Sequence, residues 1–233
     1  ITDEARLDGL PESAKAAAAA NARAKGLATD DAPAWRFTLQ MPSMLPVMQH
    51  LHDDAIRRDV WQASTRVGAC GEHDNTALVW QILELRHEKA GILGHEHFAD
   101  LTLLRRMAGS GAAALGFIEN LHQRIRPAFQ AEFRQLAQYK AAKTGQPVEA
   151  LEPWETAYWA ERQRKENYDL DDEALRPYFP VDGVMAGMFE IASRLFGIRI
   201  VQRETVCLPP GSPPSDAVET WHDEVSFYEI HDS

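Results

Sequence analysis

The sequence predicts a mainly α-helical protein, a multi-helix array with a short β element near the C-terminus. Two observations lead to this prediction. Apolar residues recur every three or four positions through most of the chain, and capping residues or glycines bound these stretches. Only the segment after residue 197 changes to β-branched and aromatic runs, which a loop rich in Pro, Gly and Ser divides.

Composition and charge exclude several classes of protein. The 233 residues carry 35 acidic against 24 basic side chains, a net charge of −11. Phosphate contacts need clustered Lys and Arg, so we expect neither a nucleic-acid partner nor a membrane partner. No apolar run reaches the ~18 residues that span a bilayer, and the first residues lack the basic and apolar regions of a signal peptide.

The number of cysteines indicates where in the cell the protein resides, and the first residue indicates whether the sequence is part of a longer protein. Cys70 and Cys207 are too few for a disulfide framework or a Cys-rich zinc site. We therefore expect two reduced thiols and a cytoplasmic location. The sequence begins with Ile1 rather than Met, so we also expect that it is a piece of a longer protein.

The first helix is expected in the Ala-rich stretch from Pro11 to Lys25. Proline is favoured where a helix begins, and Gly26 stands where a glycine commonly follows a helix end. After a loop, the apolar residues of Trp35–Leu39 alternate with polar ones over a short stretch.

A turn and a second helix are expected next. Pro42 and Pro46 are predicted to bracket the turn. Asp53 or Asp54 can then cap a helix that runs to about Val67, before a Gly-rich break.

The clearest helix of the sequence follows the capping residues Asp74–Thr76 and ends at Gly94. A shorter helix is expected over about Glu96–Met107. The clearest helix carries apolar residues on one face, at Val79, Ile82, Leu83, Ala90 and Leu93.

A long periodic segment begins at Ser110 and ends before Gly145. Pro127 lies inside it and is expected to kink or divide the helix, because proline removes a backbone donor and clashes with the preceding turn. Three further helices are expected, over 152–165, from Asp171 or Asp172 to Tyr178, and from Asp182 to Phe196.

The tail is expected to form two strands, Ile198–Val201 and Val225–Ile230, with a loop over Leu208–Ser215. A strand at a chain end leaves backbone groups unpaired, so we expect its partner strand in sequence that is absent here. We expect three parts: an N-terminal helix and linker (1–35), a helical lobe (36–197), and a strand-loop-strand element that continues into missing sequence (198–233).

Motifs for catalysis or metal binding are mostly missing. A zincin needs His-Glu-x-x-His, and His87-Glu88 lacks the second histidine. His95 and His97 have the wrong spacing, because residues two apart point to different sides of a helix. We therefore expect no catalytic residue and no metal ligand; an independent metal site formed by His87, Glu88, His95 and His97 is a weaker alternative.

A group of aromatic residues has two interpretations. These residues could line a groove for an extended peptide, but buried aromatic stripes are routine, and core packing is the favoured interpretation. The group comprises Trp154, Tyr158, Trp159, Tyr178 and Phe179. The basic stretch Arg162–Lys165 is explained by the charge preference of a helix C-terminus.

Several segments, taken together, resemble the thimet oligopeptidase-like zinc metallopeptidases, especially their bacterial members. The resemblance covers nearly the whole chain in the family's order. It rests on the stretches 37–48, 74–76, 82–88, 151–158, 169–180, 195–198 and 221–230.

This resemblance implies a fold, an activity and a cofactor for the parent protein. Its members are almost wholly helical enzymes that cleave short peptides in a deep channel. Their zinc ligands include the two histidines of His-Glu-x-x-His, a motif that does not occur in these 233 residues. The resemblance therefore implies zinc in the parent enzyme and none bound by this segment.

We accordingly expect a non-catalytic helical portion of a zinc metallo-oligopeptidase, inactive alone, that supplies channel wall and lobe packing. Its partners would be short peptide substrates of the parent and the missing C-terminal catalytic lobe. Trp154, Tyr158 and Tyr178 are candidates for the channel wall. The alternative is a free-standing helical module that binds a peptide or partner without enzymatic activity.

Overall fold

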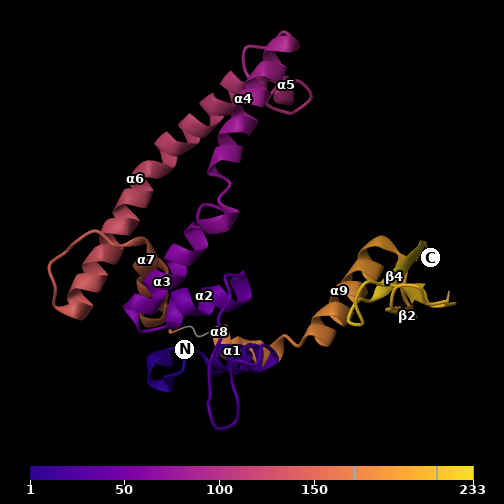
Figure 1. The fold of residues 1–233 in the computed structure, drawn as a ribbon, viewed down its shortest axis with the longest axis horizontal. Coiled ribbons are helices and arrows are strands. Elements are labelled where there is room, and N and C mark those ends of the chain that lie inside the picture. The colour runs from indigo at the N-terminus through magenta and orange to yellow at the C-terminus, as the bar shows by residue number, and fades with distance from the viewer. Residues whose placement is uncertain (170–171, 214, 233) are drawn as a thin grey trace. The chain divides into compact units, whose positions relative to one another are not determined.

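The computed structural model describes residues 1–169, 172–213 and 215–232 and confirms a mainly α-helical fold with a short β element near the C-terminus. The chain divides into two compact units, Ile1–Leu170 and Asp171–Ser233. Figure 1 shows the helices α1 to α7 in the first unit, and α8, α9 and the strands in the second.

The helices at the start of the first unit form where the capping residues predict them. A short 3-10 helix, η1 (Glu4–Leu7), precedes α1 (Glu12–Ala24), which ends just before Gly26 as expected. The helix α3 (Asp54–Thr65) is capped by Asp53, whose Oδ1 accepts a hydrogen bond from the Ile56 amide at 3.0 Å. The stretch 35–39 forms no strand; instead the Trp35 amide donates to the Ile1 carbonyl at 2.8 Å.

The prediction of a turn between Pro42 and Pro46 is wrong, because both lie in the helix α2 (Met41–His50). Pro42 stands in the first turn, where the backbone N–H has no intrahelical partner to lose. Pro46 forgoes one hydrogen bond, and burial of Val47 and Met48 on the same helix offsets that loss.

The next three helices are α4 (Thr76–Ile92), α5 (Phe98–Leu103) and α6 (Gly111–Thr144), after a short 3-10 helix, η2 (Gly71–His73). The predicted apolar face of α4 is present in the sequence, but of its five residues only Ala90 is buried. Packing joins α4 to α5 and α5 to α6.

The long helix α6 runs from its N-cap Ser110 to Gly145, whose φ of 69° ends it. Pro127 does not divide α6, because it removes one intrahelical hydrogen bond out of the many that hold a helix of 34 residues. Among the described residues, no helix is both long and apolar enough to span a bilayer.

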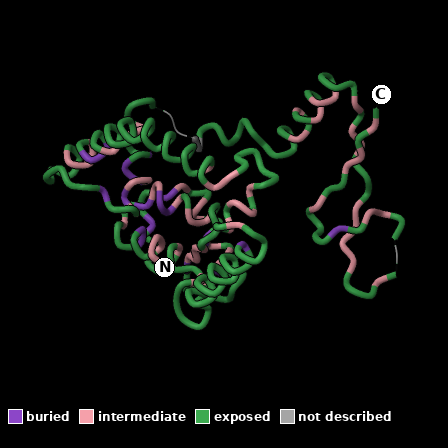
Figure 2. The backbone as a smooth tube through the Cα atoms, turned by 90° about the horizontal axis from the view of Figure 1, so that it is seen from above, coloured by how far each residue is buried: buried purple, intermediate pink, exposed green. Residues whose placement is uncertain are grey.

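The helix α7 (Pro153–Tyr168) packs against α2, α3 and α6. Glu152 and Glu155 form a capping box that fixes its first turn. Most of the buried residues lie on or next to these helices, and Figure 2 shows the buried segments gathered mainly in the unit that contains the N-terminus. Two apolar clusters form the core: Leu7, Leu10, Val47, Leu51 and Ile56 in one, and Leu136, Ala137, Leu151, Tyr158 and Trp159 in the other.

The second unit contains α8 (Asp172–Leu175), the 3-10 helix η3 (Arg176–Tyr178) and α9 (Val181–Phe196). Asp171, a predicted cap, lies outside the described residues. Four strands follow: β1 (Ile198–Arg203), β2 (Thr205–Val206), β3 (Val218–Glu219) and β4 (Phe227–Asp232).

The last strand was expected to find its partner in sequence that is absent here, but in the structure it pairs with a strand of this chain. β4 pairs with β1 in antiparallel register, with Ile200 opposite Ile230, and β2 pairs with β3 in parallel. The rings of Phe189 on α9 and Tyr228 on β4 lie 4.8 Å apart and join the helix to this sheet. Among the described residues of this unit, Thr220 alone is buried.

Candidate functional site

The predicted aromatic residue Trp154 lies in the first turn of α7 and is half-buried against α3. Its ring centroid is 5.5 Å from that of Trp61. Its Nε1 donates to Asp54 Oδ2 at 3.2 Å, and the other oxygen of Asp54 accepts from the buried Arg57 at 2.6 Å. Trp154 is thus part of the polar contact between α3 and α7.

Tyr158 lies one turn further along α7 and is only 6% exposed. The Arg57 guanidinium lies 4.1 Å from its ring centroid, and the His52 ring meets it edge-on at 6.1 Å. The Tyr158 hydroxyl accepts a hydrogen bond from Arg162 Nη1 at 2.5 Å. Tyr158 therefore has an apolar ring in the core and a polar tip at the wall of a cavity.

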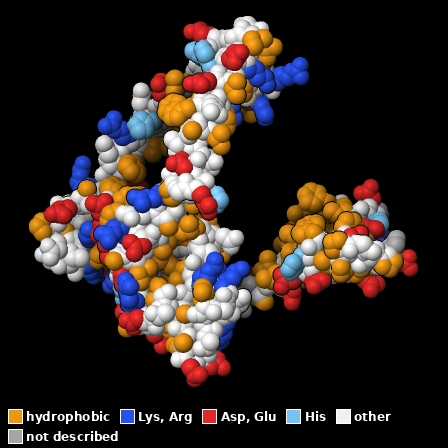
Figure 3. Space-filling view, in the orientation of Figure 1, with side chains coloured by type: hydrophobic (Ala, Val, Ile, Leu, Met, Phe, Trp, Pro, Cys, Tyr) orange, Lys and Arg blue, Asp and Glu red, His pale blue; other side chains and the backbone are white. Residues whose placement is uncertain are grey.

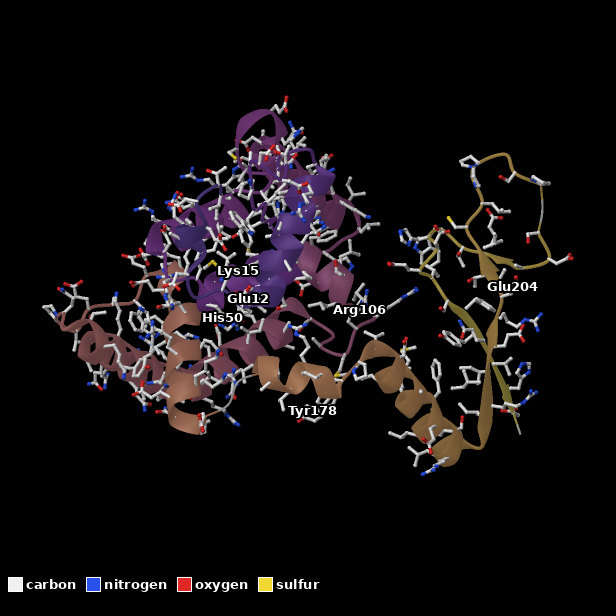
Figure 4. All side chains as sticks on the ribbon, turned by 90° about the horizontal axis from the view of Figure 1, so that it is seen from below. Glu12, Lys15, His50, Arg106, Tyr178 and Glu204 are labelled. Atoms are coloured by element: carbon white, nitrogen blue, oxygen red, sulfur yellow. The ribbon has the colours of Figure 1, made fainter. Side chains whose placement is uncertain are left out.

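That cavity lies where the end of α2, the end of α6 and the middle of α7 meet, and we call it the charged cavity. Its volume is about 460 Å³. Figure 4 labels His50, which stands on its wall at the C-terminal end of α2. Its lining residues are Gly9, Gln49, His50, His52, Tyr139, Lys143, Tyr158, Glu161, Arg162, Lys165 and Glu166.

Gly9 allows the chain to close one side of the charged cavity. Its φ is +91°, and a Cβ built there would lie 2.2 Å from the His50 carbonyl oxygen and 2.5 Å from the His52 ring. Only glycine fits so close an approach at a positive φ. The position of His52 is fixed further by Asp8, whose Oδ2 lies 2.9 Å from His52 Nδ1; this contact lowers the pKa of the Asp8 carboxyl.

A second group of partners lies across α6 and α7. Glu166 accepts hydrogen bonds from Lys143 Nζ at 2.7 Å and from the Tyr139 hydroxyl at 2.6 Å, and both contacts lower the pKa of Glu166. Burial, together with the hydrogen bond to Glu166, raises the pKa of Tyr139 to about 12. This side of the cavity is therefore a closed ion-pair network rather than a set of groups poised for proton transfer near neutral pH.

Tyr178, the third predicted aromatic residue, lies in the second unit at the end of η3. It is 78% exposed and lines a cavity of about 760 Å³ along α9, which we call the α9 groove (Figure 4). The other lining residues are Phe179, Pro180, Gly183, Val184, Gly187, Met188, Ile191, Ala192, Leu195 and Phe196. Figure 3 shows hydrophobic side chains crowded over this helix.

The four residues of the alternative metal site do not come together in the structure. Among the described residues, no group of three or more His, Cys, Asp or Glu side chains could hold a metal. The alternative site at His87, Glu88, His95 and His97 is therefore not formed.

Sequence reasoning missed the charged cavity, because its residues come from four separate segments. Arg162 was explained by the helix C-terminus alone, yet it follows Tyr158 by four residues, a spacing that places both side chains on one face of α7. That spacing was the available signal. No such signal in the sequence indicated that His52 and Gly9 line the cavity, because the two residues that make this contact lie far apart in the sequence.

Comparison with known proteins finds one matching family and several similar curated proteins. Residues 47–233 match the profile of the family described as Peptidase family M3. The whole chain is 39% identical to oligopeptidase A of Salmonella typhimurium, covering 32% of that protein. It is 36% identical to two proteins of Arabidopsis thaliana, the organellar oligopeptidase A of chloroplasts and mitochondria and a probable cytosolic oligopeptidase A, over 28% and 32% of their lengths. The chain thus spans about a third of the length of the curated relatives it matches.

Proposed function

The chain belongs to peptidase family M3, and on this premise we propose that it is a helical, non-catalytic portion of a longer zinc metallo-oligopeptidase that hydrolyses short peptides. The observation that carries the proposal is the alignment of all 233 residues with about a third of oligopeptidase A. We assign no step of peptide hydrolysis to this chain, because His-Glu-x-x-His does not occur in its sequence.

We further propose that the chain contributes channel wall and packing between lobes in the parent enzyme. The exposed apolar side chains support this role, because large apolar patches mark surfaces that another body covers. They lie in the α9 groove and on α4 and α6, where Trp80, Leu85, Phe117 and Ile118 are all exposed. In the described part of the second unit only Thr220 is buried. So little burial also supports packing of this unit against another part of the parent enzyme.

Of the three aromatic candidates, Tyr178 is the one we retain for contact with a peptide. Its ring is exposed, whereas the ring of Tyr158 is enclosed and that of Trp154 is packed on Trp61. Of these three residues, we therefore propose only Tyr178, in the second unit, as part of the channel wall.

The partners of the parent would be short peptides and the C-terminal catalytic lobe, and its location the cytoplasm. The net charge of −11 supports the expectation of neither a nucleic-acid nor a membrane partner. The relative named as a probable cytosolic oligopeptidase A supports the location.

Two measurements on the 233-residue chain test the assignment. A fluorogenic peptide assay is expected to show no cleavage above that of buffer, and a calorimetric zinc titration is expected to show no tight stoichiometric binding. Restoring the downstream sequence is expected to give zinc-dependent cleavage. Robust cleavage by the chain alone would overturn the non-catalytic role, and a natural stop codon after Ser233 would favour a free-standing binding module instead.

A further inference from the structure

The charged cavity holds an arginine, Arg162, whose charge acts on Glu166 from a distance and lowers the pKa of that carboxyl. The Arg162 guanidinium carbon lies 5.4 Å from the ring centroid of Tyr158 and 5.7 Å from that of Trp159. Its Nη1 donates to the Tyr158 hydroxyl, a neutral acceptor. Within the described part of the chain, no carboxylate forms an ion pair with Arg162.

The two carboxylates on the wall of the cavity are engaged elsewhere. Glu161 accepts two hydrogen bonds from Arg164, at 2.8 and 2.9 Å. Glu166 is held by Lys143 and by the Tyr139 hydroxyl. The N–H groups of Arg162 that do not bind Tyr158 are therefore available to a ligand, although Glu166 offsets part of the arginine charge and the chain as a whole is strongly acidic.

The aromatic rings prepare Arg162 for binding. A guanidinium that lies against aromatic rings and donates one hydrogen bond loses less conformational entropy when its other N–H groups bind a ligand. Guanidinium donors match the oxygens of a carboxylate or phosphate in a bidentate geometry. A cavity of about 460 Å³ has room for such a group and for the small molecule or residue that carries it.

We infer that the charged cavity is a binding site for a small oxyanion, with Arg162 as its principal donor. The ligand is either a free anion of the phosphate type or the carboxylate of a peptide, and both are recognised by the same donors. Tyr158 acts as a positioning residue, because its ring and hydroxyl hold the guanidinium in place.

Isothermal titration of the full 233-residue chain tests the site, at an ionic strength held constant with chloride. The probes are inorganic phosphate and an N-acetylated tripeptide with a free C-terminal carboxylate, compared with the same peptide as its amide. Saturable binding of phosphate alone identifies a free anion as the ligand. Binding of the acid but not the amide identifies a peptide carboxylate. Binding of neither probe overturns the inference.

Variants at Arg162 separate the site from general charge attraction. Arg162→Gln is expected to weaken binding about tenfold or more, because a charge-assisted hydrogen bond is lost. Arg162→Lys keeps the charge but loses the planar donor geometry, and is expected to recover part of the affinity. The control Arg124→Gln removes an exposed arginine of α6 outside the cavity, and is expected to change nothing. Equal losses in Arg162→Gln and Arg124→Gln, or wild-type affinity in Arg162→Gln, overturn the inference.

Discussion

Lys140 on α6 and Glu155 on α7 form a two-pronged ion pair, in which the lysine Nζ lies 2.7 Å from each carboxylate oxygen. Both side chains are largely buried, and Glu155 also accepts a hydrogen bond from the Glu152 amide at 3.0 Å. The Glu155 carboxylate therefore accepts a hydrogen bond from a backbone amide at the N-terminus of α7 and also joins α7 to α6 through Lys140.

Glu155→Ala is expected to lower the free energy of unfolding by about 2 kcal/mol, because it leaves a buried ammonium and a helix N-terminal amide without their acceptor. Urea denaturation followed by far-ultraviolet circular dichroism measures the change. Glu149→Ala removes an exposed carboxylate of the same unit, and is expected to stay within about 0.5 kcal/mol of the wild type. Equal effects of the two substitutions would contradict the role of the ion pair.

Gly9→Ala is expected to destabilise the first unit by about 3 kcal/mol, because the new Cβ meets the His50 carbonyl oxygen and the backbone keeps a positive φ. Gly26 also has a positive φ, of 67°, but faces open space. Gly26→Ala therefore carries the backbone strain without the clash and is expected to cost about 1 kcal/mol. Thermal unfolding of both variants measures the difference, and a Gly9→Ala variant no less stable than Gly26→Ala would refute the steric account.

The titration of Tyr139 is expected near pH 12, and tyrosinate absorbance of the wild type minus that of Tyr139→Phe measures it. Burial and the Glu166 hydrogen bond favour the neutral phenol in the folded state. Because the folded pKa lies above the ordinary tyrosine value of 10.0, this contribution to stability is complete below pH 10.0 and is lost as the pH rises toward about 12.

Glu166→Gln removes the negative charge that opposes ionisation of Tyr139, keeps an oxygen that can accept from its hydroxyl, and leaves the burial of Tyr139 unchanged. The pKa of Tyr139 is therefore expected to fall only part of the way toward 10.0. A wild-type titration at the ordinary value, unchanged in Glu166→Gln, would show that Tyr139 does not make this hydrogen bond in solution.

Ile191→Glu is expected to reduce the binding of an apolar fluorescent dye to the isolated chain by at least half, because it places a charge in the α9 groove. Ile230 is 67% exposed on β4 and does not line the groove, so Ile230→Glu provides the same change of charge elsewhere in the second unit. Dye fluorescence, with circular dichroism to verify the fold, measures both. Equal dye binding by Ile191→Glu and the wild type would argue against an open groove.

The helices were predictable because their signals are local. The caps at Asp53 and Ser110 and the glycines after α1, α6 and α9 mark boundaries that depend on a few neighbouring residues. The helix through Pro42 and Pro46 was missed because the burial of Val47 and Met48, a tertiary effect, outweighs the helix-breaking tendency of proline.

Features that join distant segments were not predictable in the same way. The pairing of β1 with β4 depends on register across more than twenty intervening residues, and the charged cavity depends on contacts from Gly9 to Arg162. The apolar periodicity of α4 correctly indicated a helix, although Leu78, Trp80 and Leu85 extend its apolar surface beyond the predicted face. It could not indicate whether the described residues cover that face, because periodicity gives the direction of a side chain and not what lies there.

The uninterrupted course of α6 has a mechanical consequence. At 1.5 Å per residue, its 34 residues form a rod about 51 Å long. α7 packs on α6 and α5 contacts it as well, so a tilt of about 5° at one end of such a rod would move the other end by about 4 Å. A small change in the geometry of the Lys140–Glu155 contact would therefore move the opposite end of α6 by a distance comparable to the length of a side chain.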